Sequence, residues 1–581
     1  MDNKKIFSKP TGFGQIIDDT IARCPEREAI VYKDWRITYG EMGSLINQTA
    51  RYLSSLGLSK GSRISVITRN CPESLLIELA ALKLGIIPVR INWRLSPEEM
   101  EYIIDLNDVN MVFYRPENPE WGKALSEHYR DEAHANKIFV NLNNTEKKSV
   151  LYDLVTGFSA DPVEMEFDPE DEAVRMHTSG TTGKPKCVIY THGGMLGEIE
   201  SVRDIYEYTD GQRYQFIAQL FHTACIGAYL SLCTGGTLVL MDRFDPSTYM
   251  QSLVDEHITA ISVVPTVLKW ILDEADKNGY DLSSLRVVRY STCPIPPATL
   301  HRAMEKLHCN FYQSYGMTEM GSIVTALVAE DHLSDNGAHL KSVGRPIPGA
   351  EMMIADKDDK ECPTGVIGEI LVKGPGRMKC YLNQPELTEN VFRGGWYHTH
   401  DMGFIDEYGY LHISGRSDDM IISGGENIHP AEITNVIMSM PGVSEAAVYG
   451  LPDETWGERV KASVVLYPDS KLTPEEIRAY CKQKIAGFKV PKEVEILPEL
   501  PKTPSGKVIL HELKSRSIAR RSSRSRCPSS PVRRPASPLS TAMLTAPSSA
   551  PAWAWVLFTT LFPLRFCSTA WSRKRKRLLT A

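Results

Sequence analysis

The stretch HTSGTTGKPK, residues 177–186, gathers hydroxyl side chains, two glycines and two lysines within ten residues. A polyphosphate is bound by backbone N–H groups that turn toward it, by hydroxyl donors and by positive charge. Gly180 and Gly183 let the backbone bend, and Lys184 and Lys186 supply positive charge. The hydroxyl donors are Thr178, Ser179, Thr181 and Thr182. The stretch therefore predicts a phosphate-binding loop.

This loop differs from a Walker A loop, in which four residues separate the glycines and Ser or Thr follows the lysine. Here two residues separate Gly180 from Gly183, and Pro185 follows Lys184. The runs EAVRM before the loop and CVIYTH after it have the composition of β-strands. We therefore expect a loop that joins two strands as a hairpin.

Four further motifs follow the loop along the chain: YGMTE (315–319), WYHTHDMG (396–403), GRSDDMIISGGENIHPAEI (415–433) and PKTPSGKV (501–508). Together with the loop, and in this order, they resemble the adenylate-forming superfamily. Its members include acyl-CoA synthetases, luciferases and the adenylation domains of peptide synthetases. The resemblance covers about residues 10–514. It implies an enzyme that activates a carboxylate with ATP and then passes the acyl group to a thiol.

The family resemblance assigns the YGMTE motif to the nucleotide. A carboxylate is a poor electrophile, and transfer of AMP from ATP turns it into a mixed anhydride with a good leaving group. The resemblance implies that Glu319, together with Thr181, binds Mg²⁺, for which hard oxygen ligands are suited. It also implies that Tyr315 covers the adenine and that Thr318 reaches the α-phosphate. The other nucleotide-binding residues that it implies here are Gln313, Ser314 and Gly316.

The later motifs supply the ribose contacts and a lysine. Asp401 can accept from two ribose hydroxyls, and the resemblance implies that Arg416 approaches the same ribose. The family usually has Gly immediately before this aspartate, where the chain has His400. In the family, the lysine that matches Lys507 contacts the carboxylate and the α-phosphate during adenylation. A compact ammonium group suits the charge that is spread over that transition state.

The resemblance also implies two domains that move relative to each other between the two half-reactions. We expect an adenylation domain over residues 1–415, a hinge at 416–418, a mobile domain over 419–514 and a basic extension over 515–581. After adenylation the small domain would rotate, Lys507 would leave, and the strand ISGGEN would enter. Gly424 and Gly425 in that strand would let the pantetheine of coenzyme A approach closely.

The kind of carboxylic acid that the enzyme activates is indicated only by a residue difference from the amino-acid-activating members of the family. Members that activate amino acids carry FDxS in the substrate region, where the Asp pairs with the substrate ammonium. This chain has Phe221 and His222 there, which argues against an amino acid and places His222 beside the carboxylate path. We expect a medium- or long-chain fatty acid, with an aryl or short branched acid as the alternative.

Two other functions remain open from the sequence. The acyl group could pass to the thiol of a carrier protein instead of coenzyme A, although no carrier domain is visible in the chain. The chain could also be an inactive relative that acts as a binding or membrane-associated protein, which the unusual C-terminal extension motivates. The intact set of motif residues argues against this second reading.

The elements that must position these residues have the pattern of an α/β protein. RISVI (63–67) is strand-like, ESLLIELAALKL (73–84) has helical spacing, and IIPVRIN (86–92) returns to strand character. Similar alternation follows at 259–275 and 285–291. We expect a large N-terminal domain of layered α/β subdomains with a small β-barrel-like part, followed by a small α+β domain.

The charge of the chain is divided unevenly. Residues 515–581 contain eleven Arg, two Lys and no acidic residue, so they carry +13 while residues 1–514 carry −20. An acidic body argues against a nucleic-acid-binding protein. The basic run 573–577 would suit an anionic lipid surface, but we expect instead a disordered extension without membrane attachment. Whether the protein forms a homodimer stays open.

Cysteine usage and the N-terminal residues bear on the cellular compartment. The twelve cysteines include no CxxC pair and no metal-like spacing. This scatter predicts reduced thiols in a cytoplasmic protein. The first fifteen residues contain no apolar run, so we expect no secretory signal.

Overall fold

The computed structural model describes residues 12–115, 125, 127–129, 137–143, 149–178, 185–292, 295, 297–417, 419–423, 426–453, 455–502 and 508–524. The chain divides into two compact units between Ser522 and Ser523, so nearly all described residues belong to the first. Within the described ranges, we found no helix whose length and apolar character would let it cross a membrane.

The largest element is a nine-stranded sheet in the order β15-β14-β13-β12-β11-β9-β10-β1-β2. Its six central strands, from β13 to β1, are parallel. At the edges, β2 pairs antiparallel with β1, β14 with β13, and β15 with β14. The strands are β1 (Glu28–Tyr32), β2 (Trp35–Thr38), β9 (Arg213–Phe216), β10 (Thr237–Leu240), β11 (Ala260–Val263), β12 (Val287–Tyr290), β13 (Asn310–Tyr315), β14 (Thr325–Leu327) and β15 (Arg345–Pro346).

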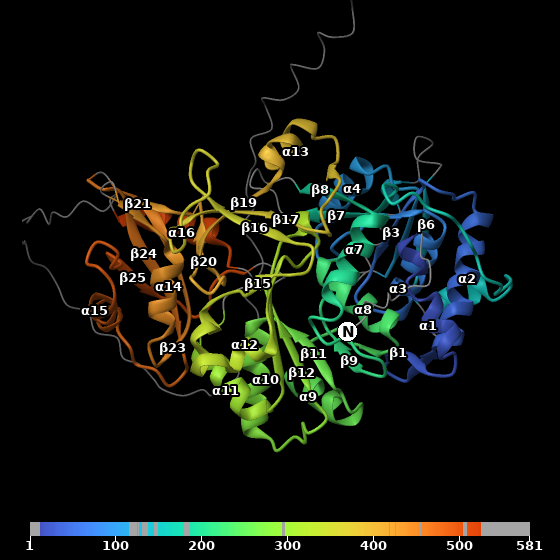
Figure 1. Cartoon of the computed structure of the whole chain (residues 1–581), viewed down its shortest axis with the longest axis horizontal. Coiled ribbons are helices and arrows are strands. Elements are labelled where there is room, and N and C mark those ends of the chain that lie inside the picture. The colour runs from blue at the N-terminus through green and yellow to red at the C-terminus, as the bar shows by residue number, and fades with distance from the viewer. Residues whose placement is uncertain are drawn as a thin grey trace, which may run out of the picture. The chain divides into compact units, whose positions relative to one another are not determined.

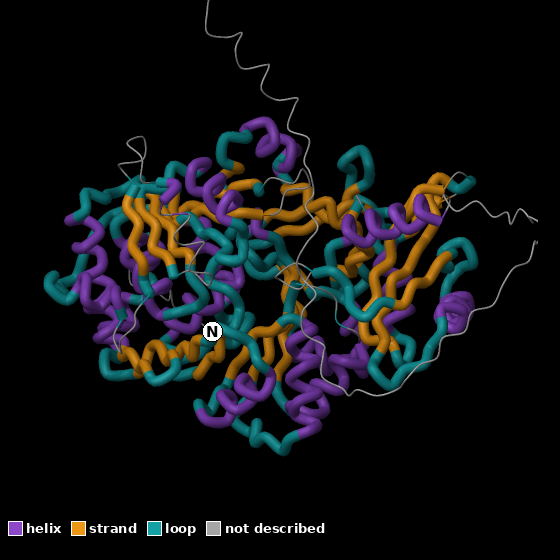
Figure 2. The backbone as a smooth tube through the Cα atoms, turned by 180° about the vertical axis from the view of Figure 1, so that it is seen from behind, coloured by secondary structure: helices purple, strands orange, loops and turns teal. Residues whose placement is uncertain are grey.

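Helices α9 (Pro246–Asp255), α10 (Pro265–Lys277) and α11 (Pro297–Leu307) cover one face of this sheet. Leu253, Leu268 and Leu300 pack there against sheet residues such as Val288 and Phe311. Figure 1 shows these helices gathered beside β11 and β12, and Figure 2 shows the same layering from behind. The predicted strand–helix–strand alternation over 259–291 is therefore confirmed.

A second, parallel sheet has the order β4-β3-β5-β6, with β3 (Arg63–Ile67), β4 (Ile87–Pro88), β5 (Met111–Tyr114) and β6 (Ile138–Asn141). The predicted strand at 63–67 and helix at 73–84 are confirmed as β3 and α3 (Pro72–Lys83). The predicted strand at 86–92 is much shorter, because Val89 leaves this sheet and bridges to Arg175. Helix α4 (Pro97–Leu106) packs on one face of this sheet.

Two antiparallel sheets follow in the chain. The first has the order β18-β8-β7 and contains β7 (Glu172–Thr178), β8 (Lys186–Thr191) and β18 (Cys380–Tyr381). The second has the order β16-β17-β19-β20, with β16 (Glu351–Ala355), β17 (Gly368–Lys373), β19 (Tyr397–Ile405) and β20 (Leu411–Arg416). The predicted hairpin around the phosphate loop is confirmed, since β7 and β8 pair antiparallel up to Thr178 opposite Lys186.

The C-terminal sheet contains β21 (Ile421–Ser423), β22 (Glu426–Ile428), β23 (Val443–Asp453), β24 (Gly457–Leu466) and β25 (Glu493–Ile496). Helices α14 (Pro430–Met438) and α15 (Pro474–Lys484) pack on one face, and α16 (Leu510–Arg524) packs on the other. Each of α14 and α15 has proline at its first position, where the missing N–H costs nothing.

Three details of this C-terminal part correct the sequence-based expectations. ISGGEN is not one strand, because β21 and β22 pair antiparallel with Ser423 opposite Glu426. Glycine commonly closes a helix, which predicts a helix end at Gly487, but α15 already ends at Lys484 with Ile485 in extended conformation. Helix α16 continues ten residues past Lys514, and the Ser517 hydroxyl lies 3.0 Å from that of Tyr449, so the first residues of the predicted extension are helical.

The remaining helices and the cysteines complete the described structure. These helices are α1 (Asp18–Arg23), α2 (Tyr39–Ser55), α6 (Val150–Val155), α7 (His192–Val202), α8 (Ile226–Thr234), α12 (Ala329–Leu333) and α13 (Pro385–Val391), with 3₁₀ turns η1 (Phe13–Gln15), η3 (Thr223–Cys225), η4 (Thr318–Met320), η5 (Ser334–Lys341) and η6 (Arg393–Gly395). All nine cysteines in the described ranges are free thiols.

Candidate active site

Asp401 lies at the centre of a cluster drawn from three elements. On neighbouring strands β19 and β20, Asp401 is directly opposite Arg416, and Arg416 Nε lies 2.9 Å from Asp401 Oδ1. At the end of β13, Tyr315 donates its hydroxyl to Asp401 Oδ2 at 2.7 Å. The structure thus brings together three predicted nucleotide-binding residues that are separated by up to about a hundred positions in the sequence.

The Asp401 carboxylate keeps acceptor capacity after these contacts. Each carboxylate oxygen has two lone-pair positions, and among the described residues each has one donor group beside it, the Tyr315 hydroxyl or Arg416 Nε. A vicinal diol could therefore still donate one hydrogen bond to each oxygen. Burial, followed by the Asp401 charge, raises the pKa of Tyr315 well above its ordinary value, so this phenol stays protonated and donates.

Glu319 forms the second cluster. It lies in η4, and its Oε1 accepts a hydrogen bond of 2.8 Å from the Tyr381 hydroxyl. The backbone N–H of Met378 donates to the Glu319 carbonyl at 2.9 Å. Lys186 Nζ lies 5.3 Å from the centre of the Tyr381 ring. Tyr381 therefore joins the predicted metal-binding carboxylate to a lysine of the predicted phosphate loop.

Tyr397 connects the two clusters, and neither Tyr381 nor Tyr397 was among the predicted site residues. Burial raises the pKa of Tyr397 above its ordinary value. Glu319 and Tyr381 add to this increase and Arg416 opposes it, so Glu319, Tyr381 and Arg416 all lie near the Tyr397 hydroxyl. Tyr397 stands inside the motif WYHTHDMG, which gave a signal that could have been used. Tyr381 lies outside every recognised motif and becomes visible only through the pairing of β18 with β8.

We predict that Tyr381→Phe lowers kcat/KM for ATP about tenfold, because one hydrogen bond to a charged group is worth about 1.5–3 kcal/mol. The phenyl ring keeps its place beside Lys186, so only the hydroxyl is tested. Steady-state kinetics with varied ATP measure the effect. Unchanged kinetics would show that Tyr381 contributes nothing to placing Glu319.

Asn107 holds both strands at the base of the phosphate-loop hairpin. Its amide nitrogen donates to His177 Nε2 at 3.0 Å, and its oxygen accepts from Cys187 Sγ at 3.2 Å. His177 and Cys187 face each other across β7 and β8. His177 Nδ1 donates to the Arg90 carbonyl, and burial lowers the pKa of this imidazole to about 4, so it stays neutral.

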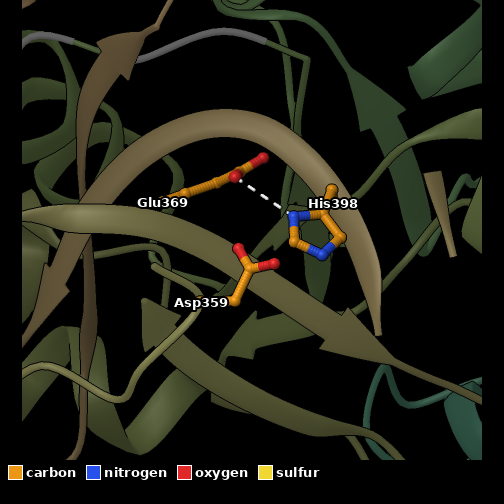
Figure 3. A group of neighbouring side chains, drawn as sticks. All are labelled: Asp359, Glu369 and His398. Atoms are coloured by element: carbon orange, nitrogen blue, oxygen red, sulfur yellow. Dashed lines mark hydrogen bonds and ion pairs between the residues drawn. The ribbon is translucent and has the colours of Figure 1, made fainter. Parts of the chain in front are cut away.

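A group of polar side chains comes from β17, β19 and the turn after β16. Ligand atoms of Asp359, Glu369 and His398 lie within 4.8 Å of one another, and His398 Nδ1 donates to Glu369 at 3.2 Å (Figure 3). The Arg393 guanidinium already provides a cation here, at 3.3 Å from Asp359 and 3.7 Å from Glu369. We therefore interpret this group as an ion-pair cluster that braces β19.

Glu369 also holds the residue before Asp401. The backbone N–H of His400 donates to Glu369 Oε1 at 3.0 Å, and His400 has a φ of +58°. Thr292 has a φ of +80°. Both residues thus hold a left-handed backbone conformation that glycine adopts without strain.

We predict that Thr292→Gly raises the free energy of unfolding by about 1 kcal/mol. The left-handed conformation costs roughly 1–2 kcal/mol for a residue with a Cβ atom, and the added freedom of glycine in the unfolded chain offsets part of this gain. Urea denaturation measures the difference. Ser291→Gly is the neighbouring control, because Ser291 has no positive φ, and equal effects at both positions would contradict the explanation.

The other predicted residues of the β13 region are also placed. Gln313 is 6 % exposed, and its carbonyl accepts from the Tyr206 hydroxyl at 3.2 Å. Ser314 pairs with Ala326 across β13 and β14. Gly316 cannot carry a side chain, since a Cβ atom would stand 2.1 Å from the Ser322 carbonyl oxygen. His222 immediately precedes η3 and packs its ring 4.4 Å from that of Phe221.

Several predicted residues lie outside the described residues, so the structure does not test their positions. They are Ser179, Gly180, Thr181, Thr182, Gly183, Lys184, Asp418, Gly424, Gly425 and Lys507. The described residues nevertheless place Thr178 and Lys186 at the two ends of the loop and bring Lys186 to the Glu319 cluster. The described carboxylates and tyrosines, with Lys186 beside them, are compatible with the ATP site of an adenylate-forming enzyme.

Comparison with known families gives the same class. The sequence model of the AMP-binding enzymes matches residues 17–382, and that of the AMP-binding enzyme C-terminal domain matches residues 432–507. The protein belongs to this family, which is the adenylate-forming superfamily that the motifs indicated. It is an ATP-dependent, AMP-forming acid–thiol ligase of the acyl-CoA synthetase type.

Individual relatives differ in their acids. A feruloyl-CoA synthase of Amycolatopsis sp is 32% identical over 494 residues, covering 85% of this chain and 96% of the relative. A long-chain-fatty-acid–CoA ligase of Mycobacterium tuberculosis is 32% identical over 482 residues, covering 82% and 92%. ATP-bound MatB from Rhodopseudomonas palustris has a similar structure, with a TM-score of 0.80 and 27% identity over 87% of this chain and 99% of that one.

Proposed function

We propose that the protein is a fatty acid–CoA ligase for medium- or long-chain acids. A carboxylate would react with ATP to give acyl-AMP and pyrophosphate, and the coenzyme A thiol would then displace AMP to give the thioester. The observation that carries the proposal is the Phe221-His222 pair, which offers no carboxylate to hold a substrate ammonium group and so argues against an amino acid. The similarity to a long-chain-fatty-acid–CoA ligase supports it.

We assign the residues of the two clusters to parts of ATP. Asp401 would accept from the two ribose hydroxyls, with Arg416 beside it and the Tyr315 ring against the adenine. Thr318 would contact the α-phosphate, and the loop from Thr178 to Lys186 would hold the other phosphates. Glu319, with Thr181, would hold Mg²⁺, which neutralises phosphate charge when it is bound.

The C-terminal part would complete the site in two poses. Lys507 would contact the reacting oxygens during adenylation, and rotation about residues 416–418 would then replace it with the β21–β22 hairpin. Gly424 and Gly425 would allow close approach of the pantetheine thiol. The free thiols of the described cysteines support our placement of the enzyme in the cytoplasm.

A pyrophosphate-release screen tests the acid. Fatty acids of increasing chain length, aryl acids and amino acids are offered with ATP, Mg²⁺ and coenzyme A, and kcat/KM is compared. We expect the highest values for medium- or long-chain fatty acids and background release with amino acids. Preference for an amino acid would overturn the assignment.

An aryl acid is the second candidate, favoured by the similarity to a feruloyl-CoA synthase at the same identity. The screen separates the two, since feruloyl-type acids would then exceed every fatty acid. The acceptor is tested separately by offering coenzyme A and a carrier protein together and by identifying the acylated thiol by mass spectrometry. Acylation of the carrier protein alone would exclude the coenzyme A ligase.

A further inference from the structure

Glu198 is a buried carboxyl group that contacts Gly321 and Ser322, directly after the YGMTE motif. It belongs to α7, and the residue is 4% exposed. The Ser322 hydroxyl donates a hydrogen bond to Glu198 Oε1, across 124 positions of sequence. A Cβ atom on Gly321 would stand 2.9 Å from the Glu198 carboxyl carbon, so the carboxyl group packs directly on the backbone there.

The backbone that Glu198 contacts is the end of the turn that carries Thr318 and Glu319. Gly321 closes η4 with a φ of +94°. Tyr190 of β8 also donates its hydroxyl to the carbonyl oxygens of Thr318 and Gly321, the latter at 3.1 Å. Two buried side chains, one from β8 and one from the helix that follows it, therefore fix this turn.

The groups that face Glu198 are Arg90 from the segment after β4, Tyr190 from β8, Cys225 from η3 and Ser322. Arg90 is already paired, since its Nε donates to Glu78 at 2.9 Å. Burial outweighs the opposing effects of Ser322 and Arg90 and raises the pKa of Glu198 to about 7. The carboxyl group therefore changes its charge near neutral pH.

We propose that Glu198 is a positioning residue for acyl-adenylate formation, which through Ser322 sets the turn that presents Thr318 and Glu319 to the nucleotide. This inference rests on the proposed roles of those two residues. The neutral carboxyl group supports the turn without adding charge. Ionisation places a buried negative charge against the end of the turn that presents Glu319 to the triphosphate. Adenylation therefore weakens as pH rises and Glu198 loses its proton.

The test measures pyrophosphate release from ATP and the preferred acid for the wild type, Glu198→Gln, Glu198→Ala and Ser322→Ala, from about pH 6 to about pH 9. Glu198→Ala should lower kcat/KM for ATP about tenfold, and Ser322→Ala by less, because each removes a buried hydrogen bond. Glu198→Gln should restore the activity near pH 6 and keep it at high pH, where the wild type declines.

A stability measurement provides an independent readout of the same proton. The ordinary pKa of 4.5 applies to the unfolded chain, and the folded value is about 7. Between these values the folded state binds more protons, so wild-type stability falls as pH rises. Glu198→Gln has no such proton to lose. The difference between its urea midpoint and that of the wild type should therefore shift in favour of the variant from about pH 5 to about pH 8.

Two outcomes overturn the inference: identical pH profiles for the wild type and Glu198→Gln, or equal loss in Glu198→Ala of adenylation and of thioester formation from supplied acyl-AMP. If Glu198→Ala does not fold, the profile of Glu198→Gln still decides. Glu319→Gln tests the proposed role of the turn separately from the proposed role of Glu198. Unchanged adenylation in that variant would refute the proposed role of the turn, whereas loss there with no effect at Glu198 would refute only the inference.

Discussion

Lys507→Ala should lower the rate of acyl-adenylate formation by roughly 10²–10³-fold, because it removes the cation proposed to stabilise charge on the reacting oxygens. Thioester formation from supplied acyl-AMP should stay within about twofold, since the second pose does not use this lysine. Pyrophosphate release measures the first half-reaction, and consumption of synthetic acyl-AMP in the presence of coenzyme A measures the second.

Lys502→Ala is a matched control for this experiment. Lys502 lies five residues earlier, and its Nζ pairs with Glu445 at 2.7 Å within the C-terminal part. Its removal should leave both half-reactions unchanged, apart from a small loss of stability. Equal loss of both half-reactions in Lys507→Ala would contradict the existence of two separate catalytic poses.

Asp401→Asn should lower kcat/KM for ATP on the order of 10²-fold. The amide keeps the shape of the side chain but replaces one acceptor oxygen with a donor, and it removes the charge that pairs with Arg416. Charge-assisted hydrogen bonds contribute about 1.5–3 kcal/mol each, so loss of ionic acceptance by a ribose diol accounts for this magnitude. The effect should appear mainly in KM for ATP and not in KM for coenzyme A.

Asp358→Asn provides the comparison, because Asp358 is 57% exposed and lies 3.7 Å from Lys357, away from Asp401 in the sequence. It should behave as the wild type. A change in KM for coenzyme A as large as that for ATP in Asp401→Asn would indicate a general disturbance of β19 and not the loss of a ribose contact.

Local patterns were sufficient for the elements that carry the motifs. Helix α3, strand β3 and the hairpin of β7 and β8 follow from apolar spacing and from Pro72, which begins the helix. The residues Tyr315, Asp401 and Arg416 followed from the family motifs, and the structure joins them by one hydrogen bond and one ion pair.

Contacts that depend on the pairing of distant segments could not be predicted in the same way. Tyr381 reaches Glu319 because β18 is the third strand beside the phosphate-loop hairpin, which no local pattern specifies. Ser322 reaches Glu198 for a similar reason. The ISGGEN segment shows the converse, because its composition suits a strand, whereas the pairing of Ser423 with Glu426 makes it a hairpin.

The contact between Asn107 and Cys187 makes the reactivity of this thiol a measure of how often the β7–β8 hairpin opens. The Cys187 residue is 1% exposed, and burial raises the pKa of its thiol to about 12, so a maleimide cannot attack it while Asn107 bridges β7 and β8. The alkylation rate of Cys187 therefore reports how often the hairpin that we propose to hold ATP opens. Saturating nucleotide should make this opening rarer and so slow the alkylation of Cys187. Nucleotide binding to the loop could then be followed by the alkylation rate, without acid, acceptor or turnover.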